Sequence, residues 1–299
     1  MWPPHAEAHR MASRQVCTPL YGEMQKVVTG TGRTLVRLPL VLEPVTGRSL
    51  GRYRMDLAGL EATLPSIKLL LLCNPHNPSG RVWSLEELRA LAELCARHGV
   101  LVVSDEIWSD WAIFGAAFTP FSVVAEPAGC SHVTLNAPTK TWNLAGLGCS
   151  FIVFLDAALK QRYCDGVYHA HLMFNTIFAM VAMRAAYAEG LPWLRAAKAY
   201  VEENIEWLER FLTERVHEIV PMRPEATYLV WLDCSGLGLE PAALGSFLLE
   251  EAKVILSNGA EFSPEHGRYQ RINCACSRST LVDAAEALER AVAARRCIL

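Results

Sequence analysis

The chain has 299 residues, of which 52% are hydrophobic and 20% charged, so it is long enough and apolar enough for one or two packed domains. Its net charge of −3 at pH 7 excludes the strongly basic surface of a nucleic-acid-binding protein. No apolar run approaches the roughly 20 residues that a membrane-spanning helix needs, so we expect neither nucleic acid nor a membrane as a partner.

The first 16 residues are polar, contain Pro3 and Pro4, and lack the apolar core of a signal peptide. We expect residues 1–16 to be disordered and to contain no strand. The ten cysteines are scattered and form no Cys-x-x-Cys pair. Without a signal peptide we expect them to be reduced and mostly buried, in a cytoplasmic protein with no metal site.

The first half of the chain alternates predicted strands with predicted helices. Residues 69–73 (LLLLC) form a continuous apolar run that is typical of a strand buried on both faces. Ser84 and Glu87 are spaced as a capping box, which predicts a helix from Ser84 to about His98. Three more apolar runs predict strands at 100–104, 132–135 and 151–155. The pattern predicts an α/β fold: a three-layer sandwich whose sheet is mainly parallel.

The second half is mainly helical. Residues 171–190 are apolar on nearly all sides, which predicts a buried helix ending at Gly190. A long amphipathic helix follows at 193–216. The remaining predicted elements are strands at 228–232, 254–256 and 271–274 and helices near 241–252 and 280–295. We therefore predict a large domain at 17–190 and a smaller α+β domain at 191–299 that includes the long connecting helix.

Polar residues follow three of the predicted strands. Residues 74–80 come after the strand at 69–73, Asp105 follows the strand at 100–104, and Lys140 lies just beyond the strand at 132–135. In parallel α/β sheets, ligands bind beyond the carboxyl ends of the strands. An amide-rich turn, an acid and a lysine are therefore expected at one edge of the sheet.

Five segments carry a family resemblance. In chain order they are CNPHNPSGRVW, VVSDEIWSDW, APTKTWNLAGL, EATYLVWLD and YQRINCACSR. They resemble fold-type I enzymes that depend on pyridoxal 5′-phosphate (PLP), within the class I/II aminotransferases. The chain is most similar to the branch of cystathionine β-lyase-like proteins, over roughly residues 16–295. One such motif is a weak signal, whereas five in family order are specific.

The resemblance implies roles at the predicted edge. Lys140 would form the Schiff base with PLP, and an apolar pocket favours the neutral, nucleophilic amine; the alternative is a surface lysine. Asp105 would keep the pyridine nitrogen protonated, so that the ring accepts electrons; the alternative is a turn aspartate. Asn77 would donate to the phenolic oxygen of PLP, which is compatible with an Asx turn. Glu106 and Asp110 are expected to be structural.

Further residues are implied for cofactor and substrate. Arg271 would grip the substrate carboxylate with its planar fork, with Arg268 as the competing candidate. Tyr21 matches an aromatic residue that stacks on the cofactor, although a core or surface tyrosine is also compatible. Thr139 could reach the cofactor phosphate. Trp108 stands where relatives carry Tyr or His; its indole can donate a hydrogen bond but cannot act as an acid or base.

Two departures from the family pattern bear on function. Gly148 stands where the aminotransferase branch has a phosphate-binding Arg, which favours the lyase branch. We also expect the family's front segment, with its phosphate-cradling turn, to be missing, and the large domain therefore to be N-terminally truncated. This truncation predicts weak PLP binding and poor solubility when the chain is expressed alone.

The sequence therefore predicts a PLP-dependent β-lyase that cleaves cystathionine or related cysteine S-conjugates to pyruvate, ammonia and a thiol. Its partner is a small amino-acid substrate, and the full-length family form is expected to be a homodimer. One alternative is a class I/II aminotransferase, which would use the same Lys140. Another is a catalytically inactive truncated paralogue or fragment. A nicotinamide dehydrogenase is disfavoured because no Gly-x-Gly-x-x-Gly turn follows a predicted strand.

Overall fold

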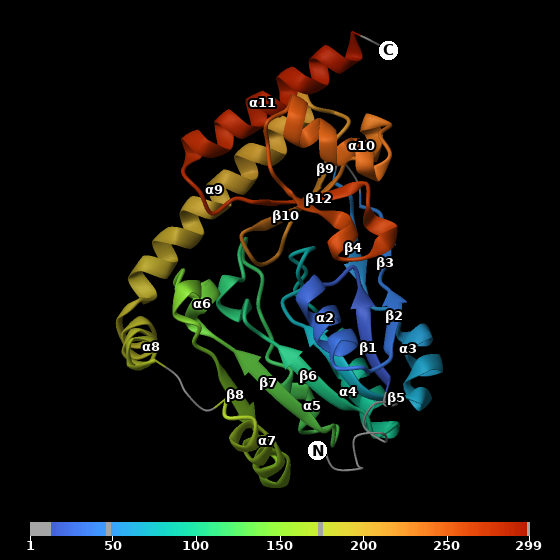
Figure 1. Ribbon diagram of the computed structural model, residues 1–299, viewed down its shortest axis with the longest axis vertical. Helices are drawn as coiled ribbons and strands as arrows, with labels where there is room; N and C mark the ends of the chain where they lie inside the picture. Colours follow the sequence, from blue (N-terminus) through green and yellow to red (C-terminus); the bar gives the residue numbers. More distant parts are fainter. Residues whose placement is uncertain (1–12, 46–48, 173–175, 298–299) are drawn as a thin grey trace.

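A computed structural model describes residues 13–45, 49–172 and 176–297 of the chain. A six-stranded sheet, in the order β2-β1-β5-β6-β7-β8, lies at its centre (Figure 1). All neighbouring pairs are parallel except β7 and β8. The strands are β1 (Ser13–Thr18), β2 (Leu35–Pro39), β5 (Ile67–Cys73), β6 (Leu101–Asp105), β7 (His132–Asn136) and β8 (Phe151–Phe154). The four strands predicted in this half are confirmed as β5 to β8.

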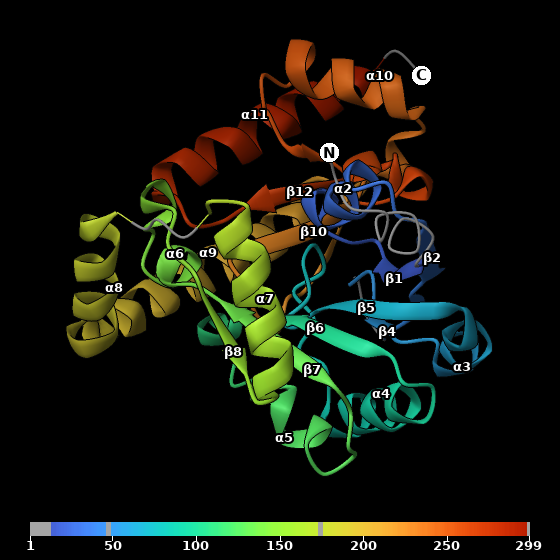
Figure 2. The same ribbon diagram turned by 60° about the horizontal axis from the view of Figure 1, so that its bottom comes forward.

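Helices cover both faces of this sheet, which confirms the three-layer α/β arrangement. The helices are α2 (Gly22–Gly30), α3 (Leu57–Thr63), α4 (Leu85–Arg97), α5 (Ser122–Ala125) and α7 (Ala157–His169). Leu60 of α3, Leu88 of α4 and Val124 of α5 share one buried cluster with Leu70 and Val102 of the sheet. Figure 2 shows α2 and α7 on the opposite face. The predicted capping box at the start of α4 is present.

A second, antiparallel sheet has the order β11-β12-β10-β9. Its strands are β9 (Val220–Met222), β10 (Leu229–Asp233), β11 (Ser257–Asn258) and β12 (Tyr269–Asn273). The helices that accompany it are α9 (Leu191–Arg215), α10 (Pro241–Ser246), the π-helical turn η5 (Phe247–Glu251) and α11 (Arg278–Arg296), whereas α8 (Ile177–Glu189) precedes them and packs against α9. These elements match the predicted smaller α+β part, except that the strand expected at 254–256 does not form; the short β11 follows it.

Shorter elements complete the described chain. A hairpin of β3 (Val41–Glu43) and β4 (Arg52–Arg54) stands beside the main sheet. The short helix α6 (Pro138–Thr141) follows β7. Single 3₁₀ turns are η1 (Leu64–Ser66), η2 (Ser109–Trp111), η3 (Ala145–Leu147), η4 (Ser235–Leu237), η6 (Gly259–Glu261) and η7 (Pro264–His266).

The prediction that residues 1–16 contain no strand is wrong. Strand β1 begins at Ser13 and lies between β2 and β5. The sequence pattern of β1 was weak because it contains the polar Gln15, which is fully buried in the structure. The side-chain NH2 group of Gln15 donates to Thr63 Oγ1 at 2.8 Å, which offsets part of the cost of burial. Residues 1–12, which were expected to be disordered, lie outside the described residues.

A helix forms within the range 171–190, but the prediction that this helix is buried is wrong. Helix α8 forms from Ile177, after an N-cap at Thr176, and ends before Gly190 as expected. Ala179 is buried, but the large apolar side chains on the outer face of α8 are exposed, with Ile177 at 70% and Phe178 at 76%. One side of α8 packs against α9 and α6, whereas the side with Ile177 and Phe178 is covered by no described part of this chain. Residues 173–175, part of the predicted range, lie outside the described residues.

The division into domains at about residue 190 stays a prediction, and the buried clusters cross it in both directions. One large cluster is formed mainly by α3, α4, β5 and β6, and the other mainly by α9, β10 and α11. Met222, Trp231 and Phe262 of the smaller part pack into the first cluster. Trp108, Trp111 and Ile113 belong by sequence to the first part but pack into the second cluster. The segment after β6 therefore ties the two parts together.

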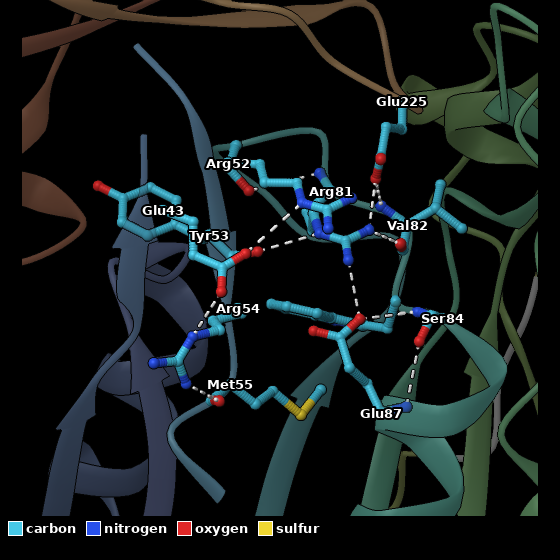
Figure 3. Close-up of polar contacts among 12 residues, drawn as sticks. Glu43, Arg52, Tyr53, Arg54, Met55, Arg81, Val82, Ser84, Glu87 and Glu225 are labelled. Atoms are coloured by element: carbon cyan, nitrogen blue, oxygen red, sulfur yellow. Dashed lines mark hydrogen bonds and ion pairs between the residues drawn. The ribbon is translucent and has the colours of Figure 1, made fainter. Parts of the chain in front are cut away.

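Arg81 makes a second connection between the two parts (Figure 3). Its guanidinium, 7% exposed, pairs with Glu87 at the start of α4 (2.8 Å) and with Glu225 before β10 (2.6 Å). It also donates to the carbonyl groups of Tyr53 (3.0 Å) and Val82. Arg81 thereby holds the loop after β5 against the smaller part.

We expect Arg81→Met to lower the free energy of unfolding by about 3 kcal/mol, because it leaves Glu87 and Glu225 without their buried partner. Urea unfolding followed by circular dichroism measures this loss. The matched control is Arg223→Met, since Arg223 is 46% exposed and pairs with Glu206 and Glu209; we expect a change of about 1 kcal/mol or less there. Equal losses in both variants would contradict an anchoring role for Arg81.

Candidate active site

Three predicted site residues lie at one edge of the central sheet. Cys73 of β5, Asp105 of β6 and Leu135 of β7 are register partners, so these strands end side by side. Asn77 follows β5, Asp105 ends β6, and Lys140 lies on α6 after β7. The convergence expected at the carboxyl ends of the parallel strands is therefore present.

The carboxyl group of Asp105 lies in a low-dielectric environment at this edge. Its Oδ1 accepts a hydrogen bond from the amide of Ile107 at 3.2 Å, and its backbone carbonyl accepts one from the amide of Asn74 at 2.9 Å. Burial raises the pKa of Asp105, while the Ile107 amide and the positive charge of Lys140 act in the opposite direction. Asp105 and Lys140 are thus electrostatically coupled across the site.

The backbone of Lys140 is held while its amine stays available. The indole N–H of Trp111 donates to the Lys140 carbonyl at 2.9 Å, and the hydroxyl of Thr141 donates to Asp110 Oδ2 at 2.9 Å. Lys140 Nζ lies 5.9 Å from the ring centroid of Trp108. In the part of the chain that the structure describes, Nζ has no hydrogen-bond or ion-pair partner. Thr139 precedes Lys140 on α6 and is partly exposed.

Arg271 reaches the same edge from the smaller part. On β12, its Nη1 donates to Asn77 Oδ1 at 2.8 Å and its Nη2 donates to Ser257 Oγ at 3.0 Å. Burial lowers the pKa of Arg271, and among the described residues it forms no salt bridge. The competing candidate, Arg268, pairs instead with Glu240 at the surface. Geometry therefore favours Arg271 for binding an anion at this site.

Tyr21 and Trp108 lie close to these residues. Tyr21 precedes α2, is 40% exposed, and is near enough to Arg271 to favour its charged form. Trp108 is buried, and its ring meets that of Tyr228 edge-on at 4.7 Å between centroids. The cofactor roles of both residues stay predictions.

Two open pockets adjoin at this edge. One has a volume of about 520 Å³ and is lined by Lys140 and four aromatic residues: Trp111, Trp193, Tyr200 and Tyr228. The other, about 450 Å³, is lined by Arg271, Ser257 and apolar residues. Both are lined by Asn273 and Cys276. Lys140 and Arg271 therefore line neighbouring pockets.

Two other titratable residues nearby, His76 and Glu106, are buried and hydrogen-bonded within the fold. His76 is buried, its Nδ1 lies 2.7 Å from Ser79 Oγ, and burial lowers its pKa to about 3, so it stays neutral at pH 7. Glu106 is buried and accepts hydrogen bonds from Ser104 Oγ and from the amide of Phe121. No group of His, Cys, Asp and Glu suited to a metal ion occurs among the described residues.

Sequence reasoning missed three residues of the site. Tyr228 was assigned only to a strand, although it contacts both Trp108 and Trp111. Ser257 carried no signal, because its contact with Arg271 comes from the pairing of β11 with β12. Trp111 was quoted within a motif, but its bond to the Lys140 carbonyl depends on folding.

Residues 15–288 match the family described as aminotransferase class I and II. The chain belongs to this family. Among its curated members, a cystathionine β-lyase, PatB of Bacillus subtilis, is 39% identical over 92% of this chain and 70% of its own length. The protein MalY of Escherichia coli is 32% identical over 93% of this chain and 70% of its own length.

Solved structures in the family share the fold closely. A PLP-bound putative aminotransferase from Clostridium difficile has a TM-score of 0.90 and 35% identity, over 94% of this chain and 71% of its own. Cystalysin from Treponema denticola, which contains PLP, also has a TM-score of 0.90, with 27% identity over 95% of this chain and 71% of its own. None of the described helices is both long and apolar enough to cross a membrane.

The residues at the edge of the sheet fit PLP, the cofactor of the family. The partly buried carboxyl group of Asp105 has one amide donor and, among the described residues, no cationic partner in direct contact, which suits the protonated nitrogen of a pyridine ring. The amine of Lys140 has no hydrogen-bond or ion-pair partner among the described residues, and Lys140 lines an open pocket, which suits an aldehyde. PLP is therefore the cofactor of this chain.

Proposed function

We propose that the chain is a PLP-dependent carbon–sulfur β-lyase that cleaves cystathionine or related cysteine S-conjugates to pyruvate, ammonia and a thiol. The observation that carries the proposal is that Lys140, Asp105 and the Asn77–Arg271 pair converge on one edge of the sheet. The similarity to PatB, a cystathionine β-lyase, supports this choice of reaction within the family.

Bound PLP supplies an aldehyde for the substrate amine and a ring that accepts electrons. Lys140 Nζ takes the proton from the substrate Cα as a positioned general base. Asp105 holds a proton on the ring nitrogen. Asn77 uses Oδ1 for Arg271, so its Nδ2 is left to donate to the phenolic oxygen of the cofactor. Tyr21, Trp108 and Thr139 complete the cofactor contacts: a stacking ring, an indole donor and a phosphate-binding hydroxyl.

Arg271 binds the substrate α-carboxylate. Its fork already holds Asn77 and Ser257, and its buried charge has no carboxylate in direct contact among the described residues. A bound carboxylate supplies the missing opposite charge and orients the substrate so that Cα faces Lys140.

We expect Arg271→Lys to raise KM for the cysteine conjugate about 10-fold to 100-fold with a smaller change in kcat, because a single ammonium group cannot reproduce the fork. Steady-state kinetics with PLP at saturation measure both constants. Arg268→Lys is the matched control and should leave both unchanged, since Arg268 pairs with Glu240 at the surface. A larger effect at position 268 would reverse the assignment.

The reaction itself is tested by supplying L-cystathionine with PLP and measuring pyruvate and free thiol. Both products are expected without any added keto acid. The family also contains aminotransferases, which use an amine acceptor. Amino transfer to a keto acid with no thiol released would replace the lyase proposal by the aminotransferase alternative.

The same proposal includes a homodimer in the cytoplasm. All ten cysteines are free, which suits a reducing compartment. The exposed apolar face of α8, formed by Ile177, Phe178, Met180 and Val181, offers a surface for a second copy. We expect sedimentation to show a species of twice the chain's 33.1 kDa mass, and Phe178→Glu to shift it to the monomer. A monomer in both proteins would contradict this part of the proposal.

A further inference from the structure

The two pockets at the active site contain little charge. Among their described lining residues, the only charged side chains are Lys140 in one pocket and Arg271 in the other. Under the proposed function both are already used, Lys140 for the Cα proton and Arg271 for the α-carboxylate. The linings therefore offer no further charged group to the S-substituent of a bound cysteine conjugate.

The pocket around Lys140 has aromatic walls instead. Trp193 and Tyr200 extend from α9, and Trp111 and Tyr228 face them from the other elements of the pocket. Trp193 and Tyr200 are 50% and 44% exposed, so their rings are accessible to a ligand. Asn143, Asn273 and Ser277 supply only neutral polar groups. Such walls stabilise an apolar or aromatic group and leave a charged one without a partner.

Cystathionine is a poor match for this aromatic lining because its distal end is charged. Besides the cysteine part, it carries a second ammonium and a second carboxylate at the end of a three-carbon chain. Placing these charged groups against aromatic side chains removes them from water, and no opposite charge in the lining compensates for the lost hydration. A conjugate with an uncharged S-substituent has no such cost and gains from burial of its apolar surface.

We propose that this chain prefers cysteine conjugates with an uncharged apolar or aromatic S-substituent over cystathionine; the inference rests on the proposed function. Conjugate and water give the thiol, pyruvate and ammonium. The C–S bond breaks with its electron pair passing to sulfur, and the proton that Lys140 takes from Cα leaves with the thiol. Water then replaces the nitrogen on the remaining three-carbon fragment, so no oxidant or reductant is needed.

S-propyl-L-cysteine and L-cystathionine make a matched pair, because the first has the same carbon chain without the distal ammonium and carboxylate. With PLP at saturation, we expect kcat/KM for the S-propyl conjugate to exceed that for cystathionine about 10-fold, and S-benzyl-L-cysteine to gain about another 10-fold. Cystathionine turned over as well as the S-propyl conjugate overturns the preference and leaves the lyase proposal intact. Pyruvate from none of the three overturns the proposed function, and the preference with it.

Trp193 tests whether the aromatic pocket is responsible. We expect Trp193→Ala to lower kcat/KM for the S-benzyl conjugate about 10-fold and to spare S-methyl-L-cysteine, whose substituent is too small to reach the ring. Trp193→Phe should restore most of the loss. The control is Leu191→Ala, an exposed apolar residue on the same helix that lines neither pocket. If Trp193→Ala lowers kcat/KM equally for both conjugates, the aromatic pocket does not determine the substrate preference.

A binding measurement separates recognition from catalysis. In the Lys140→Ala variant turnover is blocked, so titration calorimetry can compare Kd values for S-benzyl-L-cysteine and L-cystathionine directly. We expect the S-benzyl conjugate to bind about 10-fold more tightly. Tighter binding of cystathionine overturns the inference.

Discussion

Lys140→Ala is expected to lower kcat/KM for cysteine conjugates by about 1,000-fold or more, because it removes both the amine that engages the cofactor and the base at Cα. Pyruvate release with PLP at saturation measures the loss. The fold should persist, since Trp111 and Thr141 hold this segment through the Lys140 carbonyl and through Asp110. Thermal unfolding checks that expectation.

Two controls sharpen the experiment on Lys140. Lys160→Ala removes an exposed lysine from α7 and should leave activity unchanged. Added methylamine should restore part of the rate of Lys140→Ala, because a small amine can occupy the emptied space and accept the Cα proton. Activity of the variant within 10-fold of the unmodified chain would exclude Lys140 as the base.

Asp105→Asn is expected to lower kcat/KM about 100-fold or more, because an amide cannot hold a proton on the ring nitrogen of the cofactor. The matched control is Asp156→Asn. Asp156 caps α7 through the amides of Ala158 and Leu159, and Asn caps helices about as well as Asp, so activity should not change. Full activity of Asp105→Asn would contradict the assigned role.

The same variant should make the PLP-free chain more stable at neutral pH. Burial raises the folded-state pKa of Asp105 above the ordinary value of about 3.9, so the folded state penalises the ionised form. The penalty is full above the raised pKa and vanishes below the unfolded-state pKa. The stability gain of Asp105→Asn should therefore shrink as the pH falls, which urea unfolding at several pH values measures. A loss of stability at neutral pH would contradict this reading.

The elements that could be predicted are those whose signal is local. The apolar run of β5 and the Ser84–Glu87 capping box of α4 depend on neighbouring residues alone, and both are confirmed. The placement of Asp105 and Lys140 followed from a general property of parallel sheets, that their carboxyl ends share one edge.

The elements that escaped prediction depend on distant partners. Strand β1 contains the polar Gln15, whose buried side-chain NH2 group finds its acceptor in Thr63, 48 residues away in the sequence. The burial of α8 was inferred from its composition, but burial requires a covering element that composition cannot supply. Ser257 joins the site only because β11 pairs with β12 and brings it to Arg271. None of these partners is adjacent in the sequence.

The indole of Trp111 fixes the carbonyl of Lys140 and leaves its side chain untouched. The peptide unit is thus clamped while four methylene groups remain free to rotate. Under the proposed function, the amine moves between the cofactor and the substrate by torsional changes alone, which take picoseconds to nanoseconds, whereas rearrangement of a whole loop takes nanoseconds to microseconds. Because the backbone is fixed and the side chain can rotate, the proposed mechanism lets the same amine engage the cofactor and then accept the Cα proton without a loop movement.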